Sequence, residues 1–265
     1  MNILIIGSGN MGSAIAHGMI KHFETGCDLI ISDTNPEKLE QYRNLEVTVT
    51  TTLSKECLST CDTIILATKP QSFPALLQEL KSLIREPKLI LSIAAGITID
   101  TLRIHLGQEK IVRIMPNTPA LIGAGISAWY ATPSVSNEEK ERVKNILKAL
   151  GEEIETQNED EIDIATALSG SGPAYSFYFL EKLIDGAVSL GMKKNIAKRL
   201  AISTVMGSCK LAQVSQEDFS SLRQKVTSKG GTTEAAMSVF EKKSFGDIVK
   251  KAIKMAYKRA KELAQ

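Results

Sequence analysis

The sequence predicts an α/β fold in two parts, an N-terminal doubly wound sheet followed by an all-helical domain. Two observations support this prediction. Up to about residue 155, short apolar and β-branched runs alternate with stretches of helical periodicity, the pattern of strand–helix–strand folds. After residue 160 the strand signal disappears and long helical stretches follow. We therefore expect one domain over 1–158 and a second, all-helical domain over 159–265.

The expected strands are short, and the early ones are apolar at consecutive positions. Runs such as ILII at 3–6 and LILSI at 89–93 lack the alternation of a half-exposed strand, which favours a parallel sheet buried on both faces. The eight expected strands are Asn2–Ile6, Leu29–Asp33, Glu46–Thr50, Asp62–Ala67, Lys88–Ser92, Lys110–Met115, Gly125–Tyr130 and Glu152–Thr156. The expected helices of the first domain cover 11–23, 36–44, 70–84, 98–106 and 137–150, and those of the second cover 172–190, 194–213, 217–226, 233–241 and 245–264.

Composition narrows the class of protein. Thirty-two Lys and Arg against 30 Asp and Glu leave a net charge of +2, too even to indicate a nucleic-acid or membrane-surface partner. No apolar run approaches the ~20 residues that span a bilayer, and no cleavable leader is apparent. The four cysteines form no C-x-x-C pair and only three histidines are present, so we expect no metal site and a reduced, cytoplasmic protein.

A glycine-rich turn follows the first expected strand and opens an amphipathic helix. It matches G-x-G-x-x-G in the context of a dinucleotide-binding (Rossmann) unit. Gly7 permits the tight turn, Gly9 lets the backbone approach the pyrophosphate, and Gly12 allows close packing of helix on strand. The helix N-terminus offers N–H groups to the phosphates. The expected cofactor-binding residues here are Gly7, Ser8, Gly9, Asn10, Met11 and Gly12.

Further cofactor residues are expected where later strands end. Asp33 ends the second strand, where an acidic residue commonly takes the ribose hydroxyls of NAD. It favours NADH over NADPH by repelling a 2′-phosphate, although Thr34, Asn35 and Lys38 lie close enough to accommodate one. The cofactor is thus expected to be NADPH or NADH. Loops after the fourth, fifth and sixth strands should complete the crevice with Ala67, Lys69, Pro70, Ala94 and Asn117.

Two loops of small and hydroxyl residues mark a second site in the helical part. They read LSGSGPAY at 168–175 and VTSKGGTTE at 226–234. Consecutive glycines at a helix start expose N–H groups to an anion, and Ser228, Thr232 and Thr233 add hydroxyl donors. We expect this second loop to bind a small carboxylic acid, while Thr232 could also be the N-cap of the helix.

Aromatic residues crowd the first long helix of the second domain. Tyr175, Phe177, Tyr178 and Phe179 lie within five residues and cannot share one helical face. A domain of this size leaves part of such a helix uncovered. We therefore expect a homodimer formed through the helical domain.

Together these motifs resemble pyrroline-5-carboxylate reductase, the enzyme of the last step of proline biosynthesis, over the whole length. The resemblance rests on IIGSGNMGSAIA at 5–16, ATKP at 67–70, SIAAGI at 92–97, MPNTPA at 115–120, LSGSGPAY at 168–175 and, most specifically, VTSxGGTT at 226–233. Two departures concern loop rigidity. Position 229 is Lys where the family often has Pro, and Ala235-Ala236-Met237 replaces the usual Gly/Ala-Leu ending.

The resemblance implies hydride transfer from the reduced nicotinamide to the ring imine carbon of 1-pyrroline-5-carboxylate, which gives L-proline. It implies that Thr233 contacts the imine nitrogen. The carboxylate would be held by Ser228, Gly230, Gly231 and Thr232. It also implies dimers with intertwined helical domains, often assembled into decamers, with the substrate between one subunit's nicotinamide and the partner's helical domain.

Two other functions remain open from the residues. A β-hydroxyacid dehydrogenase has the same two-domain plan but places Lys and Asn in G-x-G-x-x-x-K-x-x-x-N, where alignment on Gly170 and Gly172 puts Ser176 and Leu180. A non-catalytic dinucleotide-binding sensor would not need the small-acid loop at 228–233.

Overall fold

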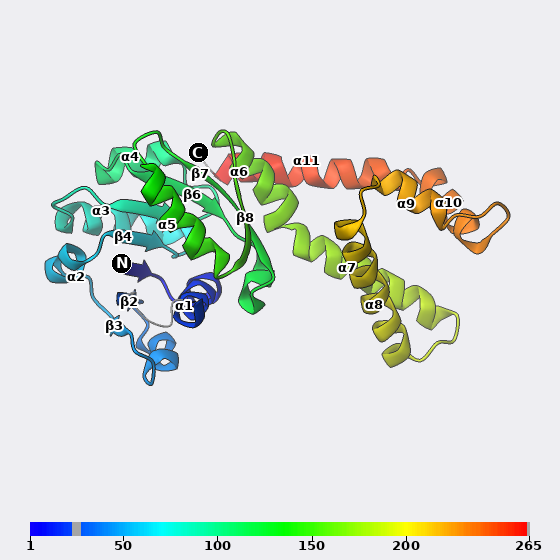
Figure 1. Ribbon diagram of the computed structural model, residues 1–265, viewed down its shortest axis with the longest axis horizontal. Helices are drawn as coiled ribbons and strands as arrows, with labels where there is room; N and C mark the ends of the chain where they lie inside the picture. Colours follow the sequence, from blue (N-terminus) through cyan, green and yellow to red (C-terminus); the bar gives the residue numbers. More distant parts are fainter. Residues whose placement is uncertain (23–27, 264–265) are drawn as a thin grey trace. The chain divides into compact units, whose positions relative to one another are not determined.

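The computed structural model describes residues 1–22 and 28–263. The chain divides into two compact units, of which the first comprises Met1–Ser171 with Ala256–Gln265 and the second comprises Gly172–Met255 (Figure 1). The first unit contains the sheet.

The sheet of the first unit has eight strands in the order β3-β2-β1-β4-β5-β6-β7-β8. The strands β1 to β6 run parallel, β7 lies antiparallel to β6, and β8 lies parallel to β7. Their bounds are β1 Asn2–Ile6, β2 Asp28–Ser32, β3 Thr48–Thr50, β4 Thr63–Leu66, β5 Leu89–Ser92, β6 Ile111–Met115, β7 Gly125–Ala131 and β8 Gly151–Glu155. All eight expected strands are present, and the predicted fold class is confirmed.

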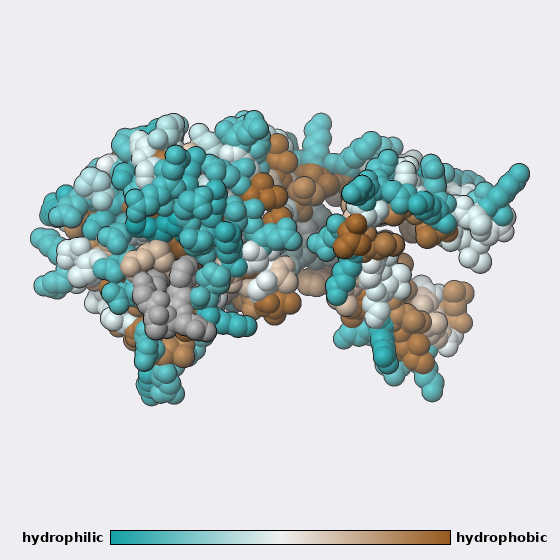
Figure 2. Space-filling model, in the orientation of Figure 1, coloured by the Kyte–Doolittle hydropathy of each residue, from teal (hydrophilic) through white to brown (hydrophobic). Residues whose placement is uncertain are grey.

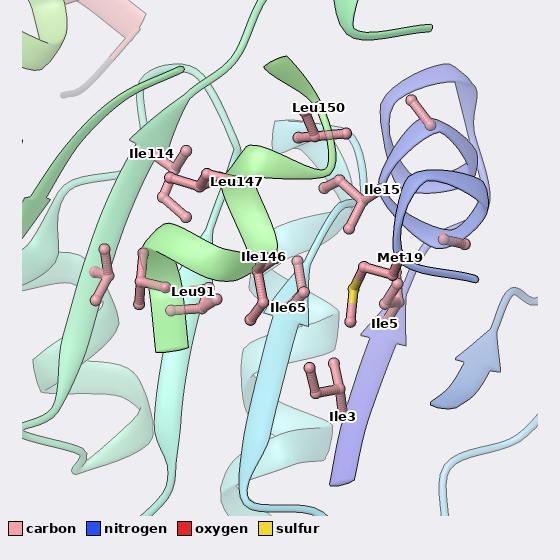
Figure 3. Close-up of a cluster of buried hydrophobic side chains, with 14 of the residues drawn as sticks. Ile3, Ile5, Ile15, Met19, Ile65, Leu91, Ile114, Ile146, Leu147 and Leu150 are labelled. Carbon is pink, nitrogen blue, oxygen red and sulfur yellow. The ribbon is translucent and has the colours of Figure 1, made fainter. Parts of the chain in front are cut away.

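Helices cover both faces of the sheet, because successive side chains of a strand point to opposite faces. One core joins Ile3 and Ile5 of β1 to α1 (Asn10–His22) and α5 (Asn137–Lys148), as Figure 3 shows. The other core joins Leu4 and Ile6 to α2 (Lys55–Thr60), α3 (Phe73–Leu83) and α4 (Ile99–Leu106). The central strands are therefore apolar at consecutive positions, as the sequence indicated.

Two short helices were not among the expected ones, α2 and α6 (Asp160–Ala165). In α2 the Ser54 hydroxyl accepts the Cys57 N–H, an N-cap that holds the short helix. Neither helix is long enough to show a clear helical period in the sequence.

Two expected elements have a different local form. The helix expected at 36–44 is a 3₁₀ helix over Pro36–Tyr42, in which the Asn35 side chain accepts the Glu37 N–H. The loop expected at 168–175 is a π-helical turn over Thr166–Gly170 that leads into α7. Such π-turns occur frequently at functional sites.

The second unit consists of helices. They are α7 Gly172–Ser189, α8 Lys194–Val214, α9 Phe219–Lys225, α10 Thr232–Lys242 and the first part of α11 Phe245–Leu263. All five expected helices are present. The end expected at residue 264 falls outside the described residues.

Apolar side chains lie exposed on the second unit of this single chain. No residue of α7 is buried, and Phe177 and Tyr178 are 67% and 64% exposed. Figure 2 shows hydrophobic side chains gathered at the surface over α7 and α8. A patch of this kind is characteristic of a protein–protein contact. Among the described residues, no helix combines the length and hydropathy that crossing a bilayer requires.

Candidate functional site

The glycine turn after β1 has the geometry that its three glycines were predicted to provide. Gly7 has a φ of +104°, and a Cβ there would lie 2.7 Å from the backbone of Ala67. A Cβ on Gly12 would lie 1.9 Å from the Gly7 carbonyl oxygen. Gly9 differs, because a Cβ there meets no atom within 4 Å. Gly7 and Gly12 therefore shape the turn, and Gly9 leaves its backbone open to approach.

A pocket of about 640 Å³ lies at the carboxyl ends of the parallel strands, beside this turn. Its volume is in the range of small-molecule and cofactor sites, roughly 300–1,000 Å³. Of the predicted cofactor residues it brings together Gly7, Gly9, Asp33, Ala67 and Lys69. The predicted residues outside its lining are Ser8, Asn10, Met11, Gly12, Pro70, Ala94 and Asn117. Thr34 and Lys38 do line it.

Thr51 and Thr52 also line the pocket and were missed from the sequence. They follow β3 directly, so the rule that ligands lie over the carboxyl ends of strands identifies them once β3 is recognised. The expected strand Glu46–Thr50 ends at the same residue as β3, so the sequence already carried the signal that identifies these two residues.

Asp33 lies at the end of β2 with a buried carboxylate. The carboxylate accepts the Ser8 N–H at 2.8 Å and the Asn35 N–H at 2.9 Å, and Lys38 Nζ lies 3.1 Å away. Burial acts to raise the pKa of Asp33, but the two amides and the Lys38 ammonium outweigh it and lower the pKa. Asp33 is therefore an anion at neutral pH that ties the glycine turn to the end of β2.

Ser8 faces inward from the turn. It is 3% exposed, and its hydroxyl lies 2.9 Å from the hydroxyl of Tyr42. The side chain thus braces the turn against the 3₁₀ helix, which explains why it does not line the pocket.

Asn117 connects two of the motif loops. Its Oδ1 accepts the Ile126 N–H at 3.0 Å, and its Nδ2 donates to Ser169 Oγ at 3.1 Å. A Cβ on Gly170 would lie 2.4 Å from Cε of Met115, the last residue of β6, so the end of β6 and the π-turn are in close contact. Two motifs that are distant in the sequence therefore form one surface.

A buried ion-pair cluster that the sequence did not reveal supports this surface. Arg113, on β6, is 1% exposed and donates to Glu159 at 2.9 Å and to Asp163 at 2.6 Å. Glu159 also accepts the N–H of Ile99, the first residue of α4, at 2.8 Å. Lys261 contacts Asp163 at 3.5 Å and pairs with Asp160. These contacts fix α6, α4 and the end of α11 to the sheet.

The loop after β5 is closely covered by the end of α11. Gly96 has a φ of +79°, and a Cβ there would lie 2.6 Å from the Leu263 carbonyl oxygen. Ala94, predicted to bind the cofactor, is 5% exposed in this loop.

The loop at 226–233 forms a tight turn before α10. The Gly231 N–H donates to the Ser228 carbonyl at 3.0 Å, and Gly230 has a φ of +74°, as a type II turn requires at its third residue. Lys229 occupies the second position, where proline is favoured.

The N-terminus of α10 presents its amides at this turn. Gly231 is the N-cap and has no side chain to cap them, so Thr232 is the first helical residue rather than the N-cap. Glu234 accepts the Gly230 N–H at 2.7 Å. Amides and the hydroxyls of Ser228, Thr232 and Thr233 therefore gather within one turn, a suitable arrangement for a carboxylate.

Comparison with known proteins extends the motif resemblance to the whole chain. A family model described as pyrroline-5-carboxylate reductase dimerisation matches residues 159–263, and one described as NADP oxidoreductase, coenzyme F420-dependent, matches residues 2–96. The pyrroline-5-carboxylate reductase of Pseudomonas aeruginosa is 35% identical over 264 residues, which cover 99% of this chain and 97% of that protein.

Solved structures agree with these matches. The structure of a pyrroline-5-carboxylate reductase from Coxiella burnetii has a TM-score of 0.92 at 35% identity and covers 100% of this chain and 98% of its own. The crystal structure of Plasmodium falciparum pyrroline carboxylate reductase with NADP bound has a TM-score of 0.88 at 31% identity, with coverage of 100% and 98%.

Proposed function

The chain belongs to the pyrroline-5-carboxylate reductase family, and we propose that its glycine turn binds the cofactor and its loop at 226–233 binds the substrate. The protein is an NAD(P)H-dependent oxidoreductase that reduces 1-pyrroline-5-carboxylate to L-proline. The observation that carries the assignment of the substrate loop is the uncapped start of α10, with its glycine pair and three hydroxyl side chains.

Bound NAD(P)H supplies the hydride. The residues proposed to hold it are those of the glycine turn and of the later strand ends, Gly7, Ser8, Gly9, Asn10, Met11, Gly12, Asp33, Ala67, Lys69, Pro70, Ala94 and Asn117. The structure fits such a group, because Gly9 is open and lines a pocket of suitable size with Asp33.

The residues of the substrate loop bind and orient a cyclic imino acid. The loop of Gly230 and Gly231 and the hydroxyls of Ser228 and Thr232 hold the carboxylate, for which the two glycine N–H groups exchange their present acceptors, Glu234 and the Ser228 carbonyl oxygen. Thr233 contacts the imine nitrogen, and its hydroxyl oxygen accepts the N–H of the protonated imine. Because a protonated imine is already electrophilic, the reaction needs positioning more than a strong base, and positioning alone can lower a barrier by roughly 7–11 kcal/mol.

We propose that the helical region forms a homodimer, and that these dimers associate further into a decamer. Support comes from the exposed aromatic side chains of α7 and from the dimerisation model matched at 159–263. This match begins at the domain boundary proposed between 158 and 159, whereas the compact units of the chain divide after Ser171. We further propose a cytoplasmic enzyme without a nucleic-acid or membrane partner, consistent with the net charge of +2.

The reverse reaction tests this assignment against its alternatives. The purified full chain should reduce NAD(P)⁺ when L-proline is added at alkaline pH. A β-hydroxyacid dehydrogenase would instead respond to β-hydroxy acids, and a sensor would bind the dinucleotide without turnover. Either of these two results would overturn the proposed function.

A further inference from the structure

The carboxylate of Asp33 is largely engaged within the protein. Oδ2 accepts the Ser8 N–H at 2.8 Å and Oδ1 accepts the Asn35 N–H at 2.9 Å. Lys38 Nζ lies 3.1 Å from Oδ2 and 3.4 Å from Oδ1. Since a carboxylate offers about four acceptor positions, the two amides leave only the positions to which Lys38 donates.

Asp33 and Lys38 differ in their freedom to change partner. The Asp33 side chain is 7% exposed and fixed by two backbone amides, whereas the Lys38 side chain is 46% exposed at the end of a flexible stem. An ion pair this accessible to water contributes little to stability. Lys38 can therefore leave Asp33 for a ligand, and Asp33 cannot move away.

Both side chains line the 640 Å³ pocket at the end of β2, where the ribose of a dinucleotide is recognised. A phosphate monoester carries about 1.5 to 2 negative charges at neutral pH. At the 2′ position it would be repelled by Asp33 unless a cation compensates. Among the described residues, Lys38 is the lysine whose ammonium group contacts Asp33, and it is therefore positioned to supply this cation.

We propose that Lys38 determines the choice between NADPH and NADH. It pairs with the 2′-phosphate of NADPH, and in the presence of NADH it stays with Asp33 or gives way to a ribose hydroxyl. Lys38 thus makes the pocket accept NADPH despite Asp33, and without Lys38 the same carboxylate selects NADH. This inference rests on the proposed function, because it requires a dinucleotide in this pocket.

Calorimetric titration of the purified full chain with NADPH and with NADH tests the proposal. Lys38→Gln should raise the Kd for NADPH about tenfold or more, the effect of one lost hydrogen bond to a charged group, and change the Kd for NADH less than about threefold. In the double variant Asp33→Asn/Lys38→Gln, removal of the carboxylate charge should restore part of the NADPH affinity. Arg43→Gln is the matched control, since Arg43 ends the same 3₁₀ helix, pairs with Glu40 and lies outside the pocket lining.

The outcomes separate this inference from the function on which it rests. Equal changes in both Kd values for Lys38→Gln, no change in either, or the same selective loss in Arg43→Gln would overturn the role of Lys38 and leave the reductase assignment intact. If the wild-type chain binds neither dinucleotide, both proposals fail. Thermal melting of each variant shows whether a loss of binding reflects a loss of folding.

Discussion

Replacement of Gly9 by alanine should separate cofactor binding from folding. The added Cβ meets no atom within 4 Å, and the φ of Gly9 is not in the left-handed region. Alanine at this position restricts the unfolded chain, which raises the free energy of unfolding by about 0.4–1 kcal/mol. Alanine is also a less favourable residue than glycine immediately before a helix, which lowers the free energy of unfolding by a similar amount. We therefore expect the free energy of unfolding to change by less than about 1 kcal/mol.

Cofactor binding should respond far more strongly. Gly9 lines the pocket, so the methyl group stands between the ligand and the amides at the start of α1. Loss of one hydrogen bond to a charged phosphate costs roughly 1.5–3 kcal/mol, which corresponds to a 10- to 100-fold rise in Kd. Calorimetric titration with NADPH measures this rise, and urea denaturation of the same sample measures stability.

Gly7→Ala provides the contrast. Its φ of +104° and the 2.7 Å approach of a Cβ to Ala67 predict a loss of stability of about 1–3 kcal/mol or more, together with the loss of binding. Wild-type affinity of Gly9→Ala for NADPH would contradict the proposed approach of the phosphates to Gly9. Unfolding of Gly9→Ala as readily as Gly7→Ala would contradict the difference between the two glycines.

Three further predictions concern the ion pairs and the substrate loop. Arg113→Met leaves the buried Asp163 without its closest cation and should lower the free energy of unfolding by about 3–5 kcal/mol. Urea denaturation monitored by the fluorescence of the single tryptophan, Trp129, measures this loss. Glu139→Gln should be less stable than wild type at pH 7. Burial acts to raise the pKa of Glu139, but Lys110 and Ser136 outweigh it and lower the pKa in the folded protein. The ionised carboxylate therefore stabilises the folded protein fully above the pKa of about 4.3 in the unfolded chain, and this stabilisation is lost as the pH falls through the lower pKa of the folded protein. Thr233→Ala should lower kcat at least tenfold, about 1.4 kcal/mol of barrier, with an unchanged melting temperature and NADPH affinity.

Each of these has a result that contradicts it. A loss below about 1 kcal/mol in Arg113→Met would show that the cluster is relaxed by water. A stability gap between Glu139→Gln and wild type that persists unchanged at pH 3 would remove the role of the ionised carboxylate. For Thr233→Ala, the exposed Thr204→Ala on α8 is the control, and equal rates in both variants would refute the proposed role of Thr233.

The sequence predicts the fold well because the local signals agree with the tertiary structure. Strands such as β1 and β5 are apolar at three or more consecutive positions since helices cover both faces, and the glycine turn falls between strand and helix as its motif requires. The loop before α10 was also predicted as an anion-binding helix start, because its glycines and hydroxyls lie within eight residues.

The details of the site depend on contacts between distant residues, which a single sequence does not reveal. Arg113 and Asp163 are 50 positions apart, and their ion pair becomes visible only when β6 and α6 are packed together. Asn117 was predicted as a cofactor residue, and the structure adds that both ends of its amide bond to protein groups, one of them 52 positions away. The engagement of Asp33 by the Ser8 amide likewise depends on how β1 and β2 pair.

The activity assigned to this chain is the reduction of a cyclic imino acid with a hydride from NAD(P)H. The most direct measurement is the oxidation of NADPH and NADH by the purified chain in the presence of 1-pyrroline-5-carboxylate, with L-proline quantified by mass spectrometry. We predict one proline formed for each dinucleotide oxidised, with at least one of the two cofactors. Dinucleotide binding without proline formation would contradict this activity.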